Sequence, residues 1–278
     1  MECDKSCLKK NSLQLLFIGT GAADHDWDHI GKPGVRGSSS ALLDGRVLID
    51  AGITVWENIR RFEVDPDEIS DILITHTHND HFLPEVIANI LAARKSALPL
   101  DIYVSPEGCR TLETVLCGGG YNLHPLKAGD NINVNGWNVI VLPSNHIISD
   151  KNLQEETFWF LFETPAGNFM YALDGAWITT RAAALIYPRK LDWIVWDCTM
   201  EKAGDMRSFE HTDLTMLDMM INGLRARNSV DDSTLHICSH MAKTLWPEDM
   251  ADSENICRSH GFVMAYDGMK IQLERKEK

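Results

Sequence analysis

The sequence predicts an α+β fold with two sheets inside and helices outside, and three observations support this. Apolar runs that are typical of strands alternate with amphipathic segments that are typical of helices along all 278 residues. Hairpin patterns stand near the start of each half. No low-complexity linker or block of like charges marks a boundary between the halves. We therefore expect one domain over residues 1–278, built of two similar halves at roughly 13–125 and 126–278.

The first half opens with an apolar run at 13–18 that ends in a Gly-Thr-Gly turn, and we expect it to be a strand. A hairpin is expected at 39–49, because Asp44-Gly45 suits a turn with positive φ. Pro84 stands where proline is tolerated, in the first turn of a helix. The other elements expected here are helices at 55–62, 84–97 and 107–116 and strands at 71–75 and 101–104.

The second half shows the same alternation. Strands at 131–134 and 137–142 flank Asn135-Gly136, and a hairpin is expected at 158–173. A helix is expected to open near Thr212, with Asp213 in its first turn. The remaining elements expected are strands at 192–196 and 234–238, a helix starting at Pro247 and a hairpin at 262–273 that turns at Asp267-Gly268.

The charge balance is acidic, since 26 Lys and Arg against 40 Asp and Glu give a formal net charge of −14. Such a charge argues against wrapping of nucleic acid or of an anionic membrane, although bound metal ions can create a local cationic site. The seven cysteines are scattered without a CxxC pair, which disfavours a zinc knuckle or a disulfide framework. With no signal peptide and no membrane span in the sequence, we expect a cytoplasmic protein with reduced thiols.

A cluster of metal-ligand residues follows the expected strand at 71–75. It reads His76-Thr-His78-Asn-Asp80-His81. In an extended stretch, residues i and i+2 point the same way, so His76 and His78 can bind one ion. Where the chain turns into the next helix, Asp80 and His81 can face a second ion. Neutral imidazoles and carboxylates suit Zn²⁺, Mn²⁺ or Fe²⁺.

Three further polar residues each end an apolar run: His146, Asp174 and His240. A β-scaffold presents such residues at one rim. Alone, each is equally compatible with an ordinary loop histidine or turn aspartate. Together with the first cluster, they indicate a composite metal site.

This series of histidines and aspartates resembles the ligand series of the metallo-β-lactamase-fold hydrolases, and its order and placement match over essentially the whole chain. The resemblance implies an αββα sandwich with a dinuclear site between the sheet edges. It also implies the ligand sets: one ion bound by His76, His78 and His146, the other by Asp80, His81 and His240, with Asp174 bridging.

Other motifs are similar to the phosphodiesterase branch, which contains ribonuclease Z and the PhnP-type cyclic phosphodiesterases. They are Leu15-Leu-Phe-Ile-Gly-Thr-Gly21, Ser38-Ser-Ser40 and Ile49-Asp50-Ala-Gly52. That branch carries one more histidine opposite the metals, and Phe209-Glu210-His211-Thr212 is placed for it. The alternative for His211 is a surface residue beside a helix N-terminus. An intact His-x-His-x-Asp-His disfavours the flavodiiron branch, and Asp174 in place of cysteine disfavours the largest group of zinc β-lactamases.

The sequence also departs from that branch. PhnP-type enzymes often hold a structural zinc with cysteines after the Gly-Thr-Gly turn, whereas the loop at 22–37 has none. His25 and His29 in this loop either line the substrate entrance, hold another ion or belong to a solvated acidic loop. The long Gly/Pro-rich arm of ribonuclease Z is missing too. The missing arm and the acidic charge together indicate a small-molecule phosphodiester substrate and disfavour long nucleic acid. A homodimer is compatible with this branch.

The resemblance implies a dinuclear-metal-dependent hydrolase, with two divalent ions, Zn²⁺ or Mn²⁺, as cofactors. A metal-bridging hydroxide would attack phosphorus, and Asp80 would orient it besides binding metal. His211 would assist the leaving group or hold a phosphate oxygen. The substrate would be a small or cyclic phosphodiester.

Two other functions remain open. The same metals suit a carboxylic-ester, thioester or lactone hydrolase, in which His211 matters less. A metal-sensing or structural role is disfavoured, because structural sites are usually closed. Specificity is expected to lie in segments 22–37, 117–128 and 144–157. Near the ligand-bearing loops, three tryptophans either stack on a substrate ring or serve packing: Trp27, Trp177 and Trp246.

Overall fold

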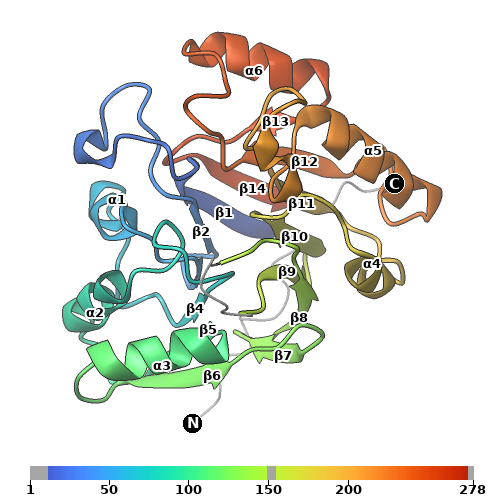
Figure 1. The fold of residues 1–278 in the computed structure, drawn as a ribbon. Coiled ribbons are helices and arrows are strands. Elements are labelled where there is room, and N and C mark those ends of the chain that lie inside the picture. The colour runs from blue at the N-terminus through green and yellow to red at the C-terminus, as the bar shows by residue number, and fades with distance from the viewer. Residues whose placement is uncertain (1–11, 149–154, 275–278) are drawn as a thin grey trace.

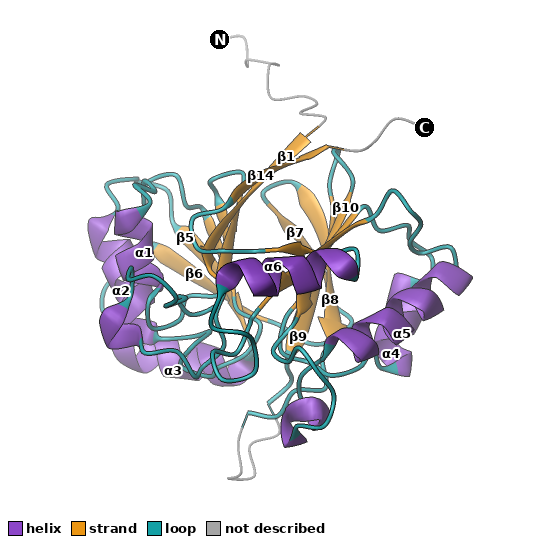
Figure 2. Cartoon of the chain, turned by 90° about the horizontal axis from the view of Figure 1, so that it is seen from above, coloured by secondary structure: helices purple, strands orange, loops and turns teal. Residues whose placement is uncertain are grey.

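The computed structural model describes residues 12–148 and 155–274, so Cys3 and Cys7 lie outside the described residues. The described chain forms two seven-stranded sheets that lie face to face between layers of helices (Figures 1 and 2). The predicted α+β sandwich is therefore confirmed.

The first sheet has the strand order β14-β1-β2-β3-β4-β5-β6. Its first four strands pair antiparallel, and β3 to β6 pair parallel. The Asp44-Gly45 turn between β2 and β3 has positive φ at both residues, as predicted. The bounds are β14 (Lys270–Glu274), β1 (Ser12–Gly19), β2 (Ser40–Leu43), β3 (Val47–Ile49), β4 (Asp71–Leu73), β5 (Leu100–Val104) and β6 (Tyr121–Pro125).

The second sheet has the order β13-β12-β11-β10-β9-β8-β7. Strands β10 to β13 pair parallel, while β7, β8, β9 and β10 pair antiparallel to one another in turn. Strands β8, β10, β11 and β12 therefore run in the same direction. The bounds are β13 (Val263–Met264), β12 (Leu235–Ser239), β11 (Trp193–Asp197), β10 (Asn168–Ala172), β9 (Phe158–Glu163), β8 (Trp137–Pro143) and β7 (Asn131–Val134).

Helices cover the outer face of each sheet (Figure 2). Pro84 and Pro106 occupy the first turns of α2 and α3, and the Asp213 side chain caps α5 by accepting a hydrogen bond from the Met216 amide. Apolar clusters join α1, α2 and α3 to the first sheet and α4, α5 and α6 to the second. The bounds are α1 (Val55–Arg61), α2 (Pro84–Ala93), α3 (Pro106–Val115), α4 (Thr180–Ile186), α5 (Leu214–Ala226) and α6 (Met250–Ser259).

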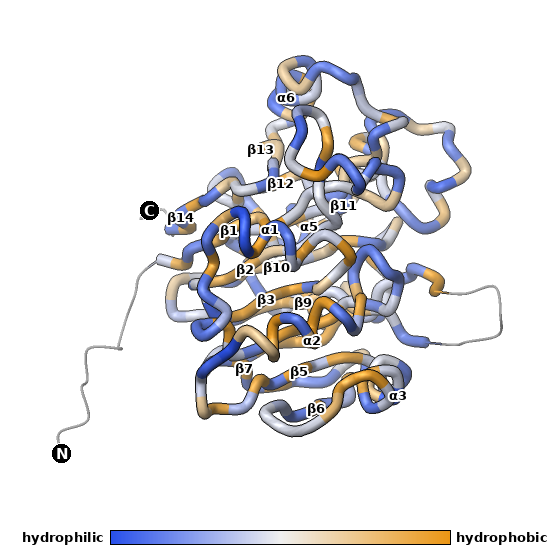
Figure 3. Tube along the Cα trace, turned by 90° about the vertical axis from the view of Figure 1, so that its left-hand side faces the viewer, coloured by the Kyte–Doolittle hydropathy of each residue, from blue (hydrophilic) through white to orange (hydrophobic). Residues whose placement is uncertain are grey.

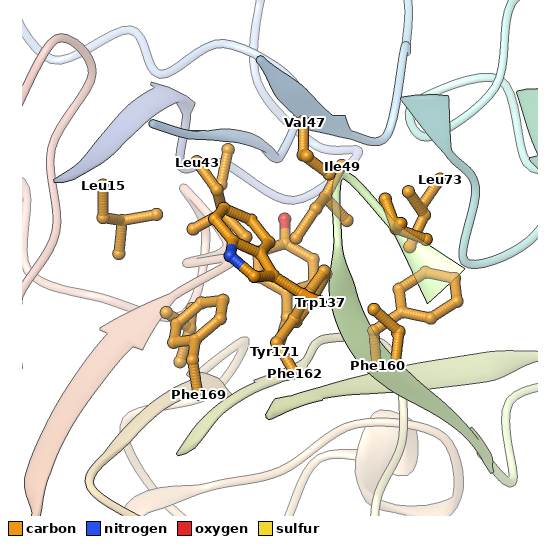
Figure 4. Packing of buried hydrophobic residues seen from close by; sticks show 14 of the residues in the cluster. Leu15, Leu43, Val47, Ile49, Leu73, Trp137, Phe160, Phe162, Phe169 and Tyr171 are labelled. Carbon is orange, nitrogen blue, oxygen red and sulfur yellow. The ribbon is translucent and has the colours of Figure 1, made fainter. Parts of the chain in front are cut away.

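The main core lies between the two sheets. Figure 4 shows aliphatic side chains of the first sheet, such as Leu43 and Ile49, facing aromatic side chains of the second, such as Phe160 and Phe162. All four are fully buried, and burial of one such side chain stabilises the fold by about 1.5–3 kcal/mol. Figure 3 shows mostly apolar segments in the middle of the molecule and mixed segments at its periphery. The sandwich thus gives the strand ends a rigid frame.

Several expected elements differ from the structure. The hairpin expected at 262–273 is wrong, because β13 pairs with β12 in the second sheet whereas β14 pairs with β1 in the first. The chain turns at Gly268, whose φ is +83°, and crosses between sheets. The segment 117–128, expected to be a specificity loop, contains β6 and pairs with β5.

Helix boundaries also differ. The helix expected at 84–97 ends at Ala93, where Arg94 adopts extended backbone and its side chain donates a hydrogen bond to the Pro66 carbonyl. The helix expected from Pro247 begins at Met250, because Asp249 supplies the cap. Helix α4 was not expected.

Candidate metal centre and active site

The predicted ligands come together at one rim of the sandwich. Strand β4 of the first sheet is followed by His76, His78, Asp80 and His81. Strands β8, β10 and β12 of the second sheet are followed by His146, Asp174 and His240, respectively. The two sheets meet at this rim, where the Phe158 amide donates a hydrogen bond to the Thr75 carbonyl over 2.9 Å. The site thus draws on both halves of the chain.

The backbone is strained at two of these positions. Asp174 has φ of 50° and His240 has φ of 57°, and Asp50, which contacts His81, has φ of 63°. Such left-handed conformations are uncommon for residues other than glycine and cluster at functional sites. Here they direct the side chains at strand ends inward.

Three histidines form the first group. Nδ1 of His78 lies 3.1 Å from Nε2 of His76 and 3.1 Å from Nε2 of His146. His76 is buried, and His78 is partly exposed and lines a pocket beside the cluster. The three nitrogens surround one point, as the ligand atoms of a single ion do.

A second group lies beside the first. Nε2 of His81 is 3.3 Å from Nε2 of His240 and 3.5 Å from Oδ2 of Asp80, and Asp80 Oδ2 is 4.0 Å from His240 Nε2. All three residues are buried. Their ligand atoms again surround one point.

The Asp174 carboxylate lies between the two groups. Its Oδ2 is 3.1 Å from Nε2 of His76 and 2.7 Å from Nε2 of His81. Its Oδ1 is 3.0 Å from Nε2 of His240 but forms no hydrogen bond of good geometry. The residue is 3% exposed, so Oδ1 is a buried acceptor beside the second group, whereas Oδ2 contacts both groups.

Outer partners fix which nitrogen of each ring faces inward. The Thr75 hydroxyl donates to Asp50 and therefore accepts from Nδ1 of His76, 3.0 Å away. Asp50 Oδ2 accepts from Nδ1 of His81 over 2.8 Å, and the Ile148 carbonyl accepts from Nε2 of His78 over 2.9 Å. Each inward nitrogen then carries a lone pair.

The same logic holds for His240. Its Nδ1 lies 2.8 Å from the Thr199 hydroxyl, which donates to Asp197 and must accept from the ring. When these rings are neutral, as metal ligands are, the four imidazoles of His76, His78, His81 and His240 point lone pairs at each other across 3.1–3.3 Å. Ligand atoms about 2.05 Å from a tetrahedral ion lie about 3.3 Å apart. The residues present therefore fit metal ions.

The pKa shifts of the cluster also favour bound cations. Burial acts to raise the pKa of Asp174, but the neighbouring His240, His81 and His146 lower it well below its usual range. Burial acts to lower the pKa of His81, but Asp174, Asp80 and Asp50 together raise it well above its usual range. The carboxylates thus create a demand for positive charge at this rim.

His211, the further histidine predicted, lies beside the cluster. Its Nδ1 is 2.8 Å from Oδ2 of Asp197 and 3.3 Å from Oδ1 of Asp174, and its ring stacks on that of His240. Burial acts to lower the pKa of His211, but Asp197 chiefly raises it to about 9. The imidazole is therefore protonated at neutral pH.

Sequence reasoning missed Asp197, Glu210 and Arg207. Asp197 ends the apolar strand β11 as Asp174 follows β10, so the same signal would have found it. Glu210 Oε2 lies 3.5 Å from Nδ1 of His146. Arg207 lines a pocket of about 430 Å³ together with Glu210, His146 and Asp24.

The histidines of the 22–37 loop do not join the cluster. His25 is buried, and its Nε2 contacts the Met241 carbonyl, whereas the exposed His29 pairs with Asp26. Among the described residues, neither belongs to a group with metal-ligand spacing. Trp246 is buried and donates to the Cys198 carbonyl, which indicates packing.

A family model described as anti-Pycsar protein Apyc1 matches residues 13–230. The chain belongs to this family. Ribonuclease Z of Methanococcus maripaludis is 28% identical over 162 residues, which are 57% of this chain and 48% of that protein. Ribonuclease Z of Methanothermobacter thermautotrophicus is 26% identical over 147 residues, 49% of this chain and 45% of that protein. The chain spans about half the length of these curated relatives.

Solved structures share the fold across nearly the whole chain of this family member. A diphosphatase of the PhnP family is 19% identical, covers 96% of this chain and 100% of its own, and has a TM-score of 0.71. The short form of human tRNase Z is 18% identical, covers 94% of this chain and 99% of its own, and has a TM-score of 0.68. Zn²⁺-bound PqqB of Methylobacterium extorquens is 15% identical, covers 93% of this chain and 99% of its own, and has a TM-score of 0.72.

The solved structures confirm the predicted fold, and the chain is similar in sequence to ribonuclease Z over about half of its length. In the described part of the chain, every helix is too short or too polar to cross a bilayer.

The Asp50 carboxylate provides a test of the outer partners. We expect Asp50→Asn to weaken metal affinity about 10–100-fold, because the amide cannot accept from both Thr75 and His81. Competition with a chromophoric chelator measures this. Asp101→Asn is the matched control, since Asp101 also pairs with a histidine, His124, over 2.8 Å but far from the cluster. Equal affinity in the two variants would contradict the assignment.

Proposed function

We propose that this protein is a dinuclear-metal-dependent phosphodiesterase that acts on a small or cyclic phosphodiester. The observation that carries the proposal is the pair of ligand groups around Asp174, with a protonated histidine facing the same pocket. The ribonuclease Z and PhnP relatives support the choice of a phosphorus ester.

His76, His78 and His146 would hold one ion, and Asp80, His81 and His240 the other, with Asp174 between them. Zn²⁺ and Mn²⁺ both suit these ligands. Two such ions supply a nucleophile at neutral pH, by lowering the pKa of bound water, and polarise a phosphoryl oxygen. Asp80 is the carboxylate of the second group and lines the pocket, so it would orient the nucleophile besides binding metal.

His211 would assist the leaving group. Its Nδ1 donates to Asp197, so its Nε2, which has no partner among the described residues, is left for the substrate. The raised pKa, about 9, keeps a proton available at Nε2 when the leaving oxygen gains charge. Asp197 acts as a positioning residue, because it sets the orientation of the ring.

Arg207 would bind a phosphate oxygen. It is the only arginine or lysine among the residues that line this pocket in the described chain. Its Nε is held by Asp205 over 3.0 Å, and its Nη1 lies 3.9 Å from Asp24. The guanidinium is thus fixed at the pocket and keeps donors for a substrate anion.

Pocket size and charge support a small substrate. A volume of about 430 Å³ is at the scale of small-ligand sites. Asp24 and Glu210 also line it, and the chain carries a net charge of −14, so a long polyanion would meet repulsion outside the metal centre.

Metal removal tests the reaction class. We expect the metal-loaded protein to hydrolyse bis(p-nitrophenyl) phosphate or a cyclic phosphate from a panel, and to lose this activity with a chelator and regain it with Zn²⁺ or Mn²⁺. Turnover of carboxylic esters, thioesters or lactones with no phosphodiester cleavage would contradict the proposal and support the alternative hydrolase.

Replacement of His211 tests the leaving-group role. We expect His211→Ala to lower kcat about 10²–10⁴-fold with metal content intact, because the proton donor is lost. Asp197→Asn should lower kcat less and shift its pH profile, since the ring keeps its proton less strongly. His260→Ala, on the far end of α6, is the control. A kcat of His211→Ala within threefold of the wild type would contradict the role.

Replacement of Arg207 tests phosphate binding. We expect Arg207→Gln to raise KM for bis(p-nitrophenyl) phosphate about 10–100-fold, the range of one charged hydrogen bond, while kcat changes little. Arg207→Lys should recover part of the loss. Arg258→Gln, at the exposed surface of α6, is the control. An unchanged KM would exclude Arg207 from substrate binding.

A further inference from the structure

A second cavity lies on the other side of the 22–25 segment from the metal centre. Its volume is about 580 Å³, and segments 31–36, 241–250 and 266–267 form its walls. We call it the basic cavity, because its lining includes four cationic side chains: Lys32, Arg36, Arg61 and Lys243.

The basic cavity carries an excess of positive charge, with four cations against two carboxylates in its lining. Asp267 and Glu248 are its only carboxylates. Asp267 accepts hydrogen bonds from the Gly37 amide and the Thr20 hydroxyl, which occupies both of its oxygens. In the described chain, none of the four cations lies within 4.0 Å of a carboxylate oxygen. An excess of positive charge is unusual on a protein whose net charge is −14.

Arg36 is a fixed cation in this wall. Its Nη1 donates to the Thr20 hydroxyl over 2.8 Å and to the Ala265 carbonyl over 2.7 Å. Both acceptors are neutral and hold the guanidinium in place, while the nearby Asp267 carboxylate offsets part of its positive charge. A preorganised cation of this kind binds an anion at little entropic cost.

The backbone adds donors beside the cations. Gly31 and Gly34 line the basic cavity with φ of +87° and +77°, a conformation that favours glycine. Neither amide has a hydrogen-bond acceptor among the described residues. Unpaired amides in such turns form concave anion sites.

Aromatic side chains give the basic cavity an apolar wall. Tyr266 is 49% exposed, and Trp246 is buried with its Nε1 bonded to Cys198, so its ring is held in place. The volume of about 580 Å³ leaves room for an organic group attached to a phosphate.

The basic cavity is separate from the metal pocket. The two share no lining residue. The wall between them is held by the Ala22 amide, which donates to the Met241 carbonyl, and by Asp24, which accepts from the Lys243 amide over 2.8 Å.

We propose that the basic cavity binds a small phosphorylated ligand at a site distinct from the metal centre. The shared chemistry is a phosphate group with two negative charges, from free phosphate or from a nucleotide. Four cations and two free amides supply the recognition, and the aromatic wall receives the organic part where there is one.

Hydrogen–deuterium exchange of the metal-loaded protein tests this, with inorganic phosphate and ADP as separate probes. We expect a probe to slow exchange in peptides covering 28–37 and 241–250, because it bonds the free amides and orders the loops. Lys32→Glu combined with Lys243→Glu should raise the half-saturating concentration at least tenfold. ADP acting at a concentration at least tenfold lower than phosphate identifies a nucleotide-type ligand; similar concentrations identify phosphate itself.

The control carries the same charge change elsewhere. Lys95→Glu combined with Lys127→Glu replaces two exposed lysines outside the basic cavity and should respond as the wild type does. Thermal unfolding and metal content verify that both double variants are folded. Protection confined to the metal-binding segment 76–81, no protection by either probe, or equal half-saturation in the two double variants would overturn the proposal. None of these readouts depends on catalytic activity.

Discussion

The Asp174 carboxylate lies within 3.1 Å of nitrogens from His76, His81 and His240, and the rest of the site is arranged around this contact. The rings cannot relieve the crowding by rotation, because Thr75, Asp50 and Thr199 hold their outer nitrogens. Lone pairs and carboxylates are therefore forced to face one another at this rim. Buried charge of one sign is costly unless a counter-charge joins it. The fold thus creates a demand that divalent cations satisfy.

That crowding is possible only because the two sheets bring distant strand ends to one edge. Strands β8, β10, β11 and β12 run in the same direction, so their carboxyl ends share a rim facing the end of β4. The loops next to the ligands are also closely packed, since a Cβ on Gly52 would lie 1.8 Å from the Asp80 carbonyl oxygen. Only glycine allows the loop after Asp50 to support the ligand loop. Outer residues are therefore as constrained as the ligands themselves.

Local signals predicted the parts of the site that follow from residue type and position at a strand end. The His76–His81 cluster and Asp174 are of this kind, and the structure brings them together. Arg207 and Glu210 carry no such signal, because their position at the pocket depends on how the segment after β11 folds back. The pairing of β14 with β1 could not be predicted from the sequence either, because Asp267-Gly268 predicts a turn but not which sheet receives the next strand. Tertiary packing decided both cases.

The effect of the net charge of −14 on ligand binding depends on where the charges lie in the structure. At the metal pocket, Arg207 is the one permanent cation among the described lining residues, so affinity for phosphate there would depend on bound metal. In the basic cavity, Arg and Lys supply the charge, and affinity would survive metal removal. The net negative charge of the chain opposes long polyanions, which extend beyond either site, more than small ones, because screening confines repulsion to about 8–10 Å. The net charge therefore selects mainly by ligand size.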